Sequence, residues 1–197
     1  MTKDELRAAV LATRRRLTED ERTAEAQALC SHLAGLPGDG GTACAYVPVG
    51  REPGSIQLIE TLRSQGFRVL LPIARHGDDG EPLPLWWAEY RPGEGDLVAA
   101  PFGLREPAPP WLPSEAVSAA TIILVPALAV DGRGARLGRG AGFYDRTLGL
   151  ATPGARLVAV VRDEELVDRL PCEPHDVPMT HVLTPAHGLV ALGGNPE

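Results

Sequence analysis

The chain contains no apolar segment long enough to cross a lipid bilayer. Its longest apolar run extends from Ile122 to Val130, nine residues interrupted by Pro126, whereas a transmembrane helix needs roughly 20 apolar residues. The first 17 residues mix charged and apolar side chains and lack the continuous apolar core of a secretory signal peptide. We therefore expect a cytoplasmic protein that does not act on a membrane.

Cysteine is scarce among the 197 residues, and lysine is nearly absent. The three cysteines, Cys30, Cys44 and Cys172, are widely spaced and form no Cys-x-x-Cys pair, which argues against a disulfide framework and against a zinc site. The 19 basic residues include a single lysine, Lys3, and a lone ammonium group in an arginine-rich chain raises the question of a specific role. The net charge of −7 argues against nucleic acid as the main partner.

Several familiar catalytic motifs are missing as well. The chain has no G-x-x-x-x-G-K-[ST] phosphate loop, no G-x-G-x-x-G dinucleotide fingerprint and no Gly-x-Ser-x-Gly nucleophile elbow. Any nucleotide chemistry must therefore rest on other residues.

The order of the predicted elements favours an α/β fold. Two amphipathic helices come first, over 4–17 and from the Thr18-x-x-Glu21 capping box to about Gly35. Beyond them strands and helices alternate, which is typical of a mainly parallel sheet with helices on both faces. The predicted strands are 42–47, 67–71, 83–90, 121–125, 156–161 and 181–183, the helices are 55–65 and 143–150, and 91–113 is a long loop. Because no repeat or boundary is visible, we expect a single three-layer, Rossmann-like domain over residues 1–197.

The densest chemistry lies in residues 131–146, DGRGARLGRGAGFYDR. This segment follows a buried strand and leads into a helix, which is where ligands bind in open α/β sheets. Its glycines let the backbone approach a ligand closely, and its arginines and the following helix N-terminus add positive potential. The residues concerned are Gly138, Gly140, Gly142, Arg133, Arg136 and Arg139. Although such a turn can be merely a tight connection, the three arginines favour an anion site.

A second basic cluster lies on the first predicted helix. At about 100° per residue, Lys3, Arg7 and Arg14 fall within roughly 40° of one another, beside the apolar stripe. They could form a solvated rim with their aliphatic stems against the core, or they could reach a ligand. Lysine is a point-charge donor that suits a terminal phosphate, so both interpretations stay open for Lys3.

Two acidic positions are candidate metal ligands. Asp176 lies in the His175-Asp176-Val-Pro-Met179 segment, and Asp145 lies in the first turn of the helix predicted at 143–150. Either His175 or Asp176 could meet a divalent metal or a substrate. A turn aspartate also satisfies local N–H groups, and a first-turn aspartate complements the helix dipole, so structural roles remain open. The other histidines, His76 among them, show no ligand spacing.

These same residues resemble the 5-formyltetrahydrofolate cyclo-ligase (5,10-methenyltetrahydrofolate synthetase) family. The similarity is spread over most of the chain, and the run LVPALAVDGRGARLGRGAGFYDR at 124–146 is its most specific part. The other matching segments are weaker but occur in the right order. They are Lys3-x-x-x-Arg7, Tyr46-Val-Pro…Glu52, Gly66-x-x-Val-x-x-Pro72, Phe102-Gly103-x-x-Glu106-Pro107 and the HDVPM segment.

The resemblance implies an ATP- and Mg²⁺-dependent ligase of folate one-carbon metabolism. In that reaction ATP phosphorylates the formyl oxygen of 5-formyltetrahydrofolate, N10 attacks the activated carbon, and phosphate leaves to give 5,10-methenyltetrahydrofolate and ADP. Such chemistry needs mainly positioning and charge neutralisation. The implied partner is a small-molecule substrate. We expect no nucleic-acid partner, and we expect the protein to be a monomer.

The resemblance also assigns residues to roles. ATP would be bound by Lys3, Arg7, Arg136, Gly138, Arg139, Gly140, Ala141, Gly142, Phe143 and Tyr144. The folate would be bound by Arg7, Val47, Glu52, Arg139, Gly140 and Phe143, with Glu52 accepting N–H groups of the pterin. Asp145 and Asp176 would hold Mg²⁺, a cation that prefers oxygen ligands. Lys3, Arg139 and Tyr144 would be the catalytic residues.

Two positions depart from the family pattern. Ala141 stands where relatives usually carry glycine or lysine, and Phe143 stands where they carry tyrosine. One alternative is therefore a non-catalytic relative that binds nucleotide or folate without turnover. Another is a sugar-phosphate isomerase or a CoA-transferase-like enzyme on a similar fold, which would need a carboxylate base and no ATP.

Overall fold

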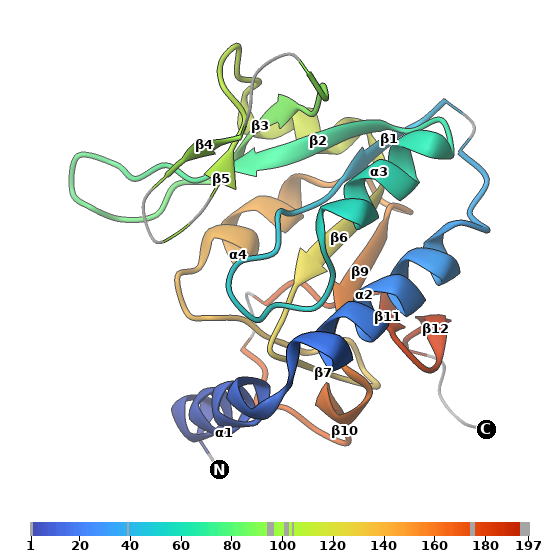
Figure 1. Cartoon of the computed structure of the whole chain (residues 1–197). Helices are drawn as coiled ribbons and strands as arrows, with labels where there is room; N and C mark the ends of the chain where they lie inside the picture. Colours follow the sequence, from blue (N-terminus) through green and yellow to red (C-terminus); the bar gives the residue numbers. More distant parts are fainter. Residues whose placement is uncertain are drawn as a thin grey trace.

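A computed structural model describes residues 2–38, 40–93, 97–100, 103, 105–173 and 176–193 (Figure 1). Phe102 and His175, which belong to the motifs discussed above, lie outside the described residues. The chain begins with helices α1 (Lys3–Arg16) and α2 (Glu19–Leu33). The predicted capping box is confirmed, because Thr18 Oγ1 accepts the Glu21 N–H at 3.2 Å and Glu21 Oε2 accepts the Thr18 N–H at 2.8 Å. No helix in the described part of the chain is long and apolar enough to span a membrane.

A seven-stranded sheet forms the centre of the molecule, in the order β12-β11-β9-β6-β1-β2-β3. The five central strands pair in parallel, whereas β3 and β12 add antiparallel edges. The strands are β1 (Thr42–Cys44), β2 (Arg68–Ile73), β3 (Trp86–Glu89), β6 (Ala120–Pro126), β9 (Arg156–Val160), β11 (His181–Thr184) and β12 (Gly188–Ala191). The predicted mainly parallel α/β sheet is confirmed. The strand predicted at 42–47 is too long, because the chain leaves the sheet after Cys44, and β12 was not predicted.

Both faces of the sheet are buried, which explains the uninterrupted apolar run of β6. Ile122 and Leu124 point into one apolar cluster, and Ile123 and Val125 point into the other. Helices α2 and α3 (Ile56–Ser64) cover the first face (Figure 1). The second face is covered by shorter elements, namely the 3₁₀ helices η2 (Ser114–Ala119) and η3 (Leu148–Leu150) and helix α4 (Phe143–Thr147).

Two small sheets accompany the main one. The first, in the order β10-β7-β8, joins β7 (Ala129–Asp131), β8 (Arg136–Leu137) and β10 (Leu166–Val167), the last following the 3₁₀ helix η4 (Asp163–Glu165). The second pairs β4 (Val98–Ala99) with β5 (Arg105–Glu106). The prediction of an uninterrupted loop over 91–113 is therefore wrong. Strands of two or three residues are too short to leave an alternating pattern in a sequence.

Helix α1 packs beside the β10-β7-β8 sheet (Figure 1). Its apolar stripe, Leu6, Val10 and Leu11, contacts a small cluster that includes Leu128 and Leu137. Arg14 continues this face, but its side chain is only 2% exposed. The solvated-rim interpretation is thus wrong for Arg14, which extends into the interior and pairs with Glu165.

Candidate functional site

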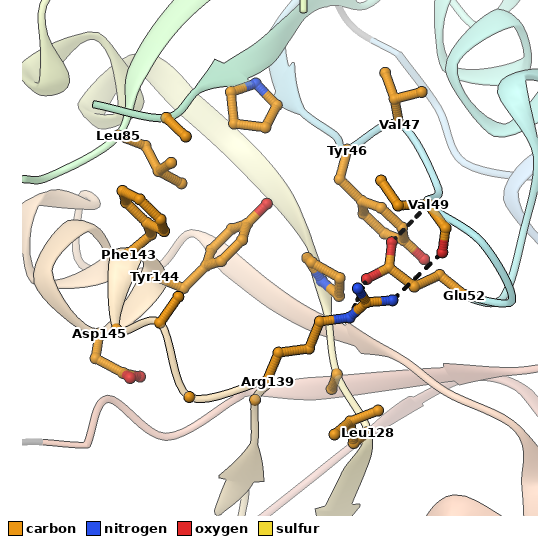
Figure 2. Close-up of a pocket in the computed structure, with 18 of the residues that line it drawn as sticks. Tyr46, Val47, Val49, Glu52, Leu85, Leu128, Arg139, Phe143, Tyr144 and Asp145 are labelled. Atoms are coloured by element: carbon orange, nitrogen blue, oxygen red, sulfur yellow. Dashed lines mark hydrogen bonds and ion pairs between the residues drawn. The ribbon is translucent and has the colours of Figure 1, made fainter. Parts of the chain in front are cut away.

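A cavity of about 290 Å³ opens at the carboxyl ends of β1, β2 and β6 (Figure 2). Its walls come from the segments that follow these strands and from the glycine- and arginine-rich segment. Figure 2 shows Phe143 and Tyr144 on one side and Tyr46 and Val47 on the other, with Arg139 reaching across. The lining includes Val47, Glu52, Arg136, Gly138, Arg139, Gly140, Ala141, Gly142, Phe143, Tyr144 and Asp145. Eleven of the fourteen residues to which the resemblance assigns a role therefore meet at one cavity.

The carboxylate of Asp131 organises the start of the glycine-rich segment. Asp131 is fully buried and accepts the backbone N–H groups of Arg133, Ala135 and Leu170, each at 3.0 Å. Burial disfavours its charge, but these donors together with the Arg133 guanidinium outweigh burial and hold the pKa of Asp131 below its usual value. Arg133 is engaged by Asp131 and by the Leu170 carbonyl and does not line the cavity. Because Arg133 is paired with Asp131 and lies outside the cavity lining, its position does not support the predicted contribution to an anion site.

Gly134 lies in the turn that follows Asp131 and packs closely against Met179. Its φ is +89°, and a Cβ at this position would come within 2.2 Å of the Met179 carbonyl oxygen. The Met179 N–H donates to the Gly134 carbonyl at 2.8 Å. The turn is thereby joined to the segment that follows Asp176, which explains why glycine stands here.

Arg136 and Asp145 form an ion pair beneath the glycine-rich loop, with Arg136 Nη2 at 2.5 Å from Asp145 Oδ1. The Arg136 side chain is only 6% exposed, and its guanidinium lies 5.8 Å from the centre of the Tyr144 ring. Burial raises the pKa of Tyr144 far above its usual value. Tyr144 is thus a neutral hydroxyl that can donate a hydrogen bond to a ligand.

Glu52 and Arg139 form the second charged pair of the cavity, with Arg139 Nε at 3.1 Å from Glu52 Oε1. The other carboxylate oxygen of Glu52 accepts the Val49 N–H at 2.8 Å. Burial raises the pKa of Glu52 above its usual value, although the Val49 N–H and Arg139 oppose the shift. A nearly buried carboxylate that already accepts two donors is well suited to recognise the N–H groups of a planar heterocycle.

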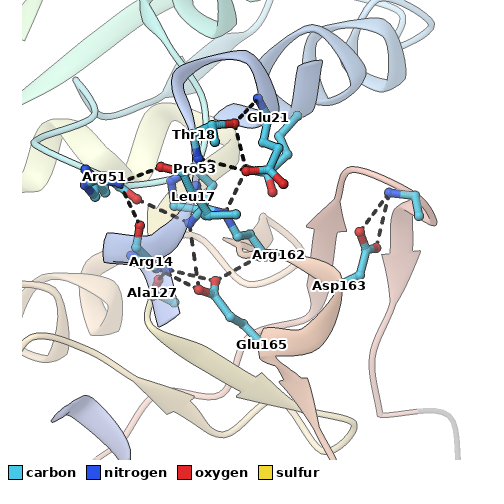
Figure 3. Close-up of polar contacts among 12 residues, drawn as sticks. Arg14, Leu17, Thr18, Glu21, Arg51, Pro53, Ala127, Arg162, Asp163 and Glu165 are labelled. Atoms are coloured by element: carbon cyan, nitrogen blue, oxygen red, sulfur yellow. Dashed lines mark hydrogen bonds and ion pairs between the residues drawn. The ribbon is translucent and has the colours of Figure 1, made fainter. Parts of the chain in front are cut away.

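A buried arginine–glutamate network supports the loop that carries Glu52 (Figure 3). Arg14 binds both oxygens of Glu165, at 2.7 and 2.8 Å, and donates to the Ala127 carbonyl at 2.7 Å. Arg162 donates to the Arg51 carbonyl at 3.2 Å, while Arg51 donates to the carbonyls of Arg14 and Leu17. The network therefore links Arg51, the residue before Glu52, and Ala127, another residue of the cavity lining, to α1 through Arg14.

Two basic residues of α1, Lys3 and Arg7, do not belong to the cavity lining. Arg7 Nε donates to the Gly138 carbonyl at 3.0 Å, and a methyl group on Gly140 would lie 3.6 Å from Arg7 Cζ. Lys3 Nζ is 2.8 Å from Glu173 Oε1 and 3.5 Å from Asp176 Oδ2. The hydrogen bond to Glu173 raises the pKa of Lys3, so its ammonium group stays charged. The structure thus brings Arg7 against the glycine-rich loop but places Lys3 beside Asp176, outside the cavity lining.

The two carboxylates selected as metal ligands lie in separate pairs. Asp145 is held by Arg136, and Asp176 Oδ2 accepts the Glu173 N–H at 2.8 Å and lies near Lys3. Within the described ranges no group of three His, Cys, Asp or Glu side chains could hold a metal ion. Carboxylate oxygens fit Mg²⁺, and this ion usually takes one or two of them together with waters and substrate phosphates. Asp145 and Asp176 are thus of the ligand type that Mg²⁺ takes, and each is held by partners within the protein.

Several lining residues were not selected from the sequence. Tyr46, His76, Leu85, Arg105 and Glu106 contribute to the wall. His76 packs edge-on against Phe143, with 5.2 Å between ring centroids, and Glu106 Oε1 accepts the Ala74 N–H at 2.8 Å. The only sequence signal was that Tyr46 and Glu106 fall in motifs of the resemblance. His76 carried none, because a lone histidine in a polar loop is indistinguishable from a solvated one.

This arrangement defines an α/β domain in which a glycine- and arginine-rich loop borders a mainly apolar cavity. Residues 1–185 match the model of the 5-formyltetrahydrofolate cyclo-ligase family. The chain is 62% identical over 191 residues to the 5-formyltetrahydrofolate cyclo-ligase of Mycolicibacterium smegmatis, covering 97% of each protein. It is 33% identical over 146 residues to the enzyme of the same name from Escherichia coli K12, covering 74% of this chain and 78% of that protein.

Solved structures agree with the match. The NMR structure of Aquifex aeolicus 5,10-methenyltetrahydrofolate synthetase superimposes with a TM-score of 0.77 at 27% identity, covering 100% of this chain and 96% of that one. A 5,10-methenyltetrahydrofolate synthetase from Mycoplasma pneumoniae shares the fold, with a TM-score of 0.68 at 20% identity over 92% of this chain and 98% of that one. The chain belongs to the 5-formyltetrahydrofolate cyclo-ligase family and is an enzyme of the ligase class. The isomerase and CoA-transferase alternatives are not supported by this membership.

Proposed function

We propose that this protein catalyses the ATP-dependent cyclisation of 5-formyltetrahydrofolate to 5,10-methenyltetrahydrofolate, with release of ADP and phosphate. The observation that carries the proposal is the convergence of the glycine- and arginine-rich segment and the Glu52–Arg139 pair on one cavity. One wall offers the glycine-rich backbone and two arginine side chains to phosphates, and the other offers the nearly buried Glu52 carboxylate to a heterocycle.

The two substrates would meet at Arg139. ATP would lie along the loop from Arg136 to Tyr144, with Arg7 and Lys3 closing over its phosphates from α1. The pterin would lie against Val47 and Phe143, with its N–H groups on Glu52. Since Arg139 extends from the glycine-rich loop to Glu52, it would lie between the terminal phosphate and the formyl group.

The reaction then needs charge control more than covalent participation. The formyl oxygen attacks the terminal phosphorus, the bond to the ADP oxygen breaks, and negative charge develops on the transferred phosphoryl oxygens. Arg139 and Lys3 neutralise that charge, and the neutral Tyr144 hydroxyl donates a hydrogen bond. N10 subsequently attacks the activated carbon and loses its proton, and the former formyl oxygen leaves in inorganic phosphate.

Asp145 and Asp176 would hold Mg²⁺ when the nucleotide is bound, and the metal would neutralise phosphate charge and orient the phosphates. Arg136 would keep the Asp145 carboxylate in place in the absence of the metal. We further propose that residues 1–197 act as one catalytic domain, as a monomer in the cytoplasm.

The test follows methenyl absorbance after purified protein is mixed with MgATP and 5-formyltetrahydrofolate. We expect product only with ATP, and one ADP for each methenyl group formed. The matched variant Glu52→Gln should raise the KM for the folate more than the KM for ATP. ATP binding without product would identify a non-catalytic relative and make Ala141→Gly the next variant, whereas failure to bind ATP would overturn the assignment of the glycine-rich loop.

A further inference from the structure

A second cavity of about 460 Å³ lies next to the first one. The two share Val47, Glu52 and Arg105 as lining residues, so they are adjacent compartments separated by these side chains. The rest of the second lining comes from α2, the 48–56 loop and the segment after β3, and it includes Arg22, Ser55, Ile56, Tyr90 and Leu97. None of residues 136–145 contributes to it, so the second cavity is separate from the candidate phosphate loop.

The second cavity has an excess of unpaired positive charge. Arg22 Nε is buried and has no hydrogen-bond partner among the described residues, which is a costly state for a guanidinium nitrogen. Among the described residues, Arg105, at the boundary of the two cavities, donates only to the Leu97 carbonyl, at 3.2 Å. Both arginines are therefore available to an anion.

The acidic groups nearby are already engaged. Glu21 accepts both donors of the Thr18 cap, and Glu25 pairs with Arg162 at 2.7 Å. Glu52, the one carboxylate in the lining, is paired with Arg139 and accepts the Val49 N–H. No carboxylate in this part of the described chain pairs with Arg22, so its guanidinium can accept an anionic ligand.

The proposed folate substrate carries negative charge at the end opposite its pterin group. Its pterin and aminobenzoyl groups are planar and largely apolar, and they are followed by a glutamate that carries two carboxylates. The first cavity, at about 290 Å³, is at the lower limit of the roughly 300–1,000 Å³ typical of ligand sites and must also admit a terminal phosphate. With the pterin on Glu52, the other end of the molecule has to extend past the residues that the two cavities share.

We propose that the second cavity binds the glutamate carboxylates of the folate. Arg22 is the main residue that contacts them, and Arg105 contacts them at the boundary of the two cavities. The inference rests on the proposed function. It assigns α2, which has no part in the phosphate site, a direct role in substrate recognition.

The test compares two substrates in steady-state kinetics. One is 5-formyltetrahydrofolate, and the other is its diamide, in which both glutamate carboxylates are converted into uncharged carboxamides of nearly the same shape. Arg22→Met should raise the KM for 5-formyltetrahydrofolate by about tenfold, the loss expected for one charge-assisted hydrogen bond. It should leave the KM for the diamide, the KM for ATP and kcat unchanged.

Two further variants separate recognition from folding. Arg22→Lys keeps the charge and should recover part of the affinity for 5-formyltetrahydrofolate. Arg15→Met, an exposed arginine on α1, is the matched control and should change neither KM. Thermal unfolding of all variants shows whether loss of Arg22 has merely loosened α2.

The outcomes distinguish the two levels of the proposal. If Arg22→Met raises both KM values equally, or neither, while the wild-type enzyme turns over both compounds, the carboxylate site is wrong and the cyclisation stands. If the wild-type protein forms no methenyl product from either compound, the proposed function itself fails.

Discussion

Arg136 and Asp145 are joined by an ion pair of 2.5 Å across the base of the glycine-rich loop. The sequence predicts that Arg136 binds the nucleotide and that Asp145 binds the metal ion. In the structure the two side chains are paired with each other. The loop is therefore held in shape by its own charges before any phosphate arrives, and a phosphate–metal complex would exchange with this internal pair.

Asp145→Asn should raise the Mg²⁺ concentration needed for half-maximal activity by about tenfold, because one carboxylate–metal contact is lost. The measurement is a Mg²⁺ titration of the initial rate at saturating ATP. Asp168→Asn, an exposed aspartate, is the control. An unchanged Mg²⁺ requirement combined with a raised KM for ATP would instead restrict Asp145 to the role of holding Arg136.

Lys3→Arg should lower kcat by about tenfold or more while leaving the unfolding midpoint unchanged. The charge is kept, but a guanidinium fork replaces the compact ammonium group that suits a terminal phosphate. The Lys3 contacts to Glu173 and Asp176 are partly exposed and so contribute little to stability. Unaltered kinetics would mean that Lys3 only forms its surface contacts with Glu173 and Asp176.

Arg14→Met should destabilise the protein by about 3 kcal/mol, since it breaks a buried, bidentate ion pair and leaves Glu165 short of a partner. Urea unfolding measures this loss, with the exposed neighbour Arg15→Met as a control expected to stay within about 0.5 kcal/mol of the wild type. A variant as stable as its control would show that the contacts of Arg162 with Glu165, including the 2.9 Å hydrogen bond from the Arg162 N–H, are enough to stabilise the buried carboxylate.

Asp131→Asn should lower the unfolding free energy at neutral pH by about 2 kcal/mol, because an amide cannot accept from three N–H groups and pair with Arg133. The pKa of Asp131 is lowered by folding. Its charge therefore stabilises the protein above the unfolded-state pKa of about 3.9, and this contribution is lost as the pH falls through the lower, folded-state value.

The difference in unfolding free energy between wild type and Asp131→Asn should thus shrink on acidification below about pH 4. Denaturant titrations at a series of pH values measure it. A difference independent of pH would show that the cost lies in packing rather than in the charge of Asp131.

Long periodic segments were predictable from the sequence because their pattern is local. The helices at α1, α2 and α3 and the central strands follow from apolar spacing and from caps such as Thr18 and Glu21. The short strands β7, β8 and β10 were missed, as they exist only through pairing with one another and leave no periodic signal.

Residue chemistry along one continuous segment was also readable from the sequence. The loop from Arg136 to Asp145 was identified as an anion site because its glycines and arginines are neighbours in the chain, and the structure places it in a cavity wall. Arg133 and Arg14 could not be judged in this way, because their partners Leu170 and Glu165 are distant in sequence.

The sequence by itself determined the α/β order of elements, the glycine- and arginine-rich segment that lines the cavity and the family resemblance, all of which depend on residues close to one another along the chain. Only the tertiary structure decided which arginines face the ligand cavity, which carboxylates are already paired, and that a second, positively charged cavity adjoins the first. Those properties arise from contacts between residues far apart in the sequence. Burial and charge pairing at such contacts are set by packing, not by local pattern.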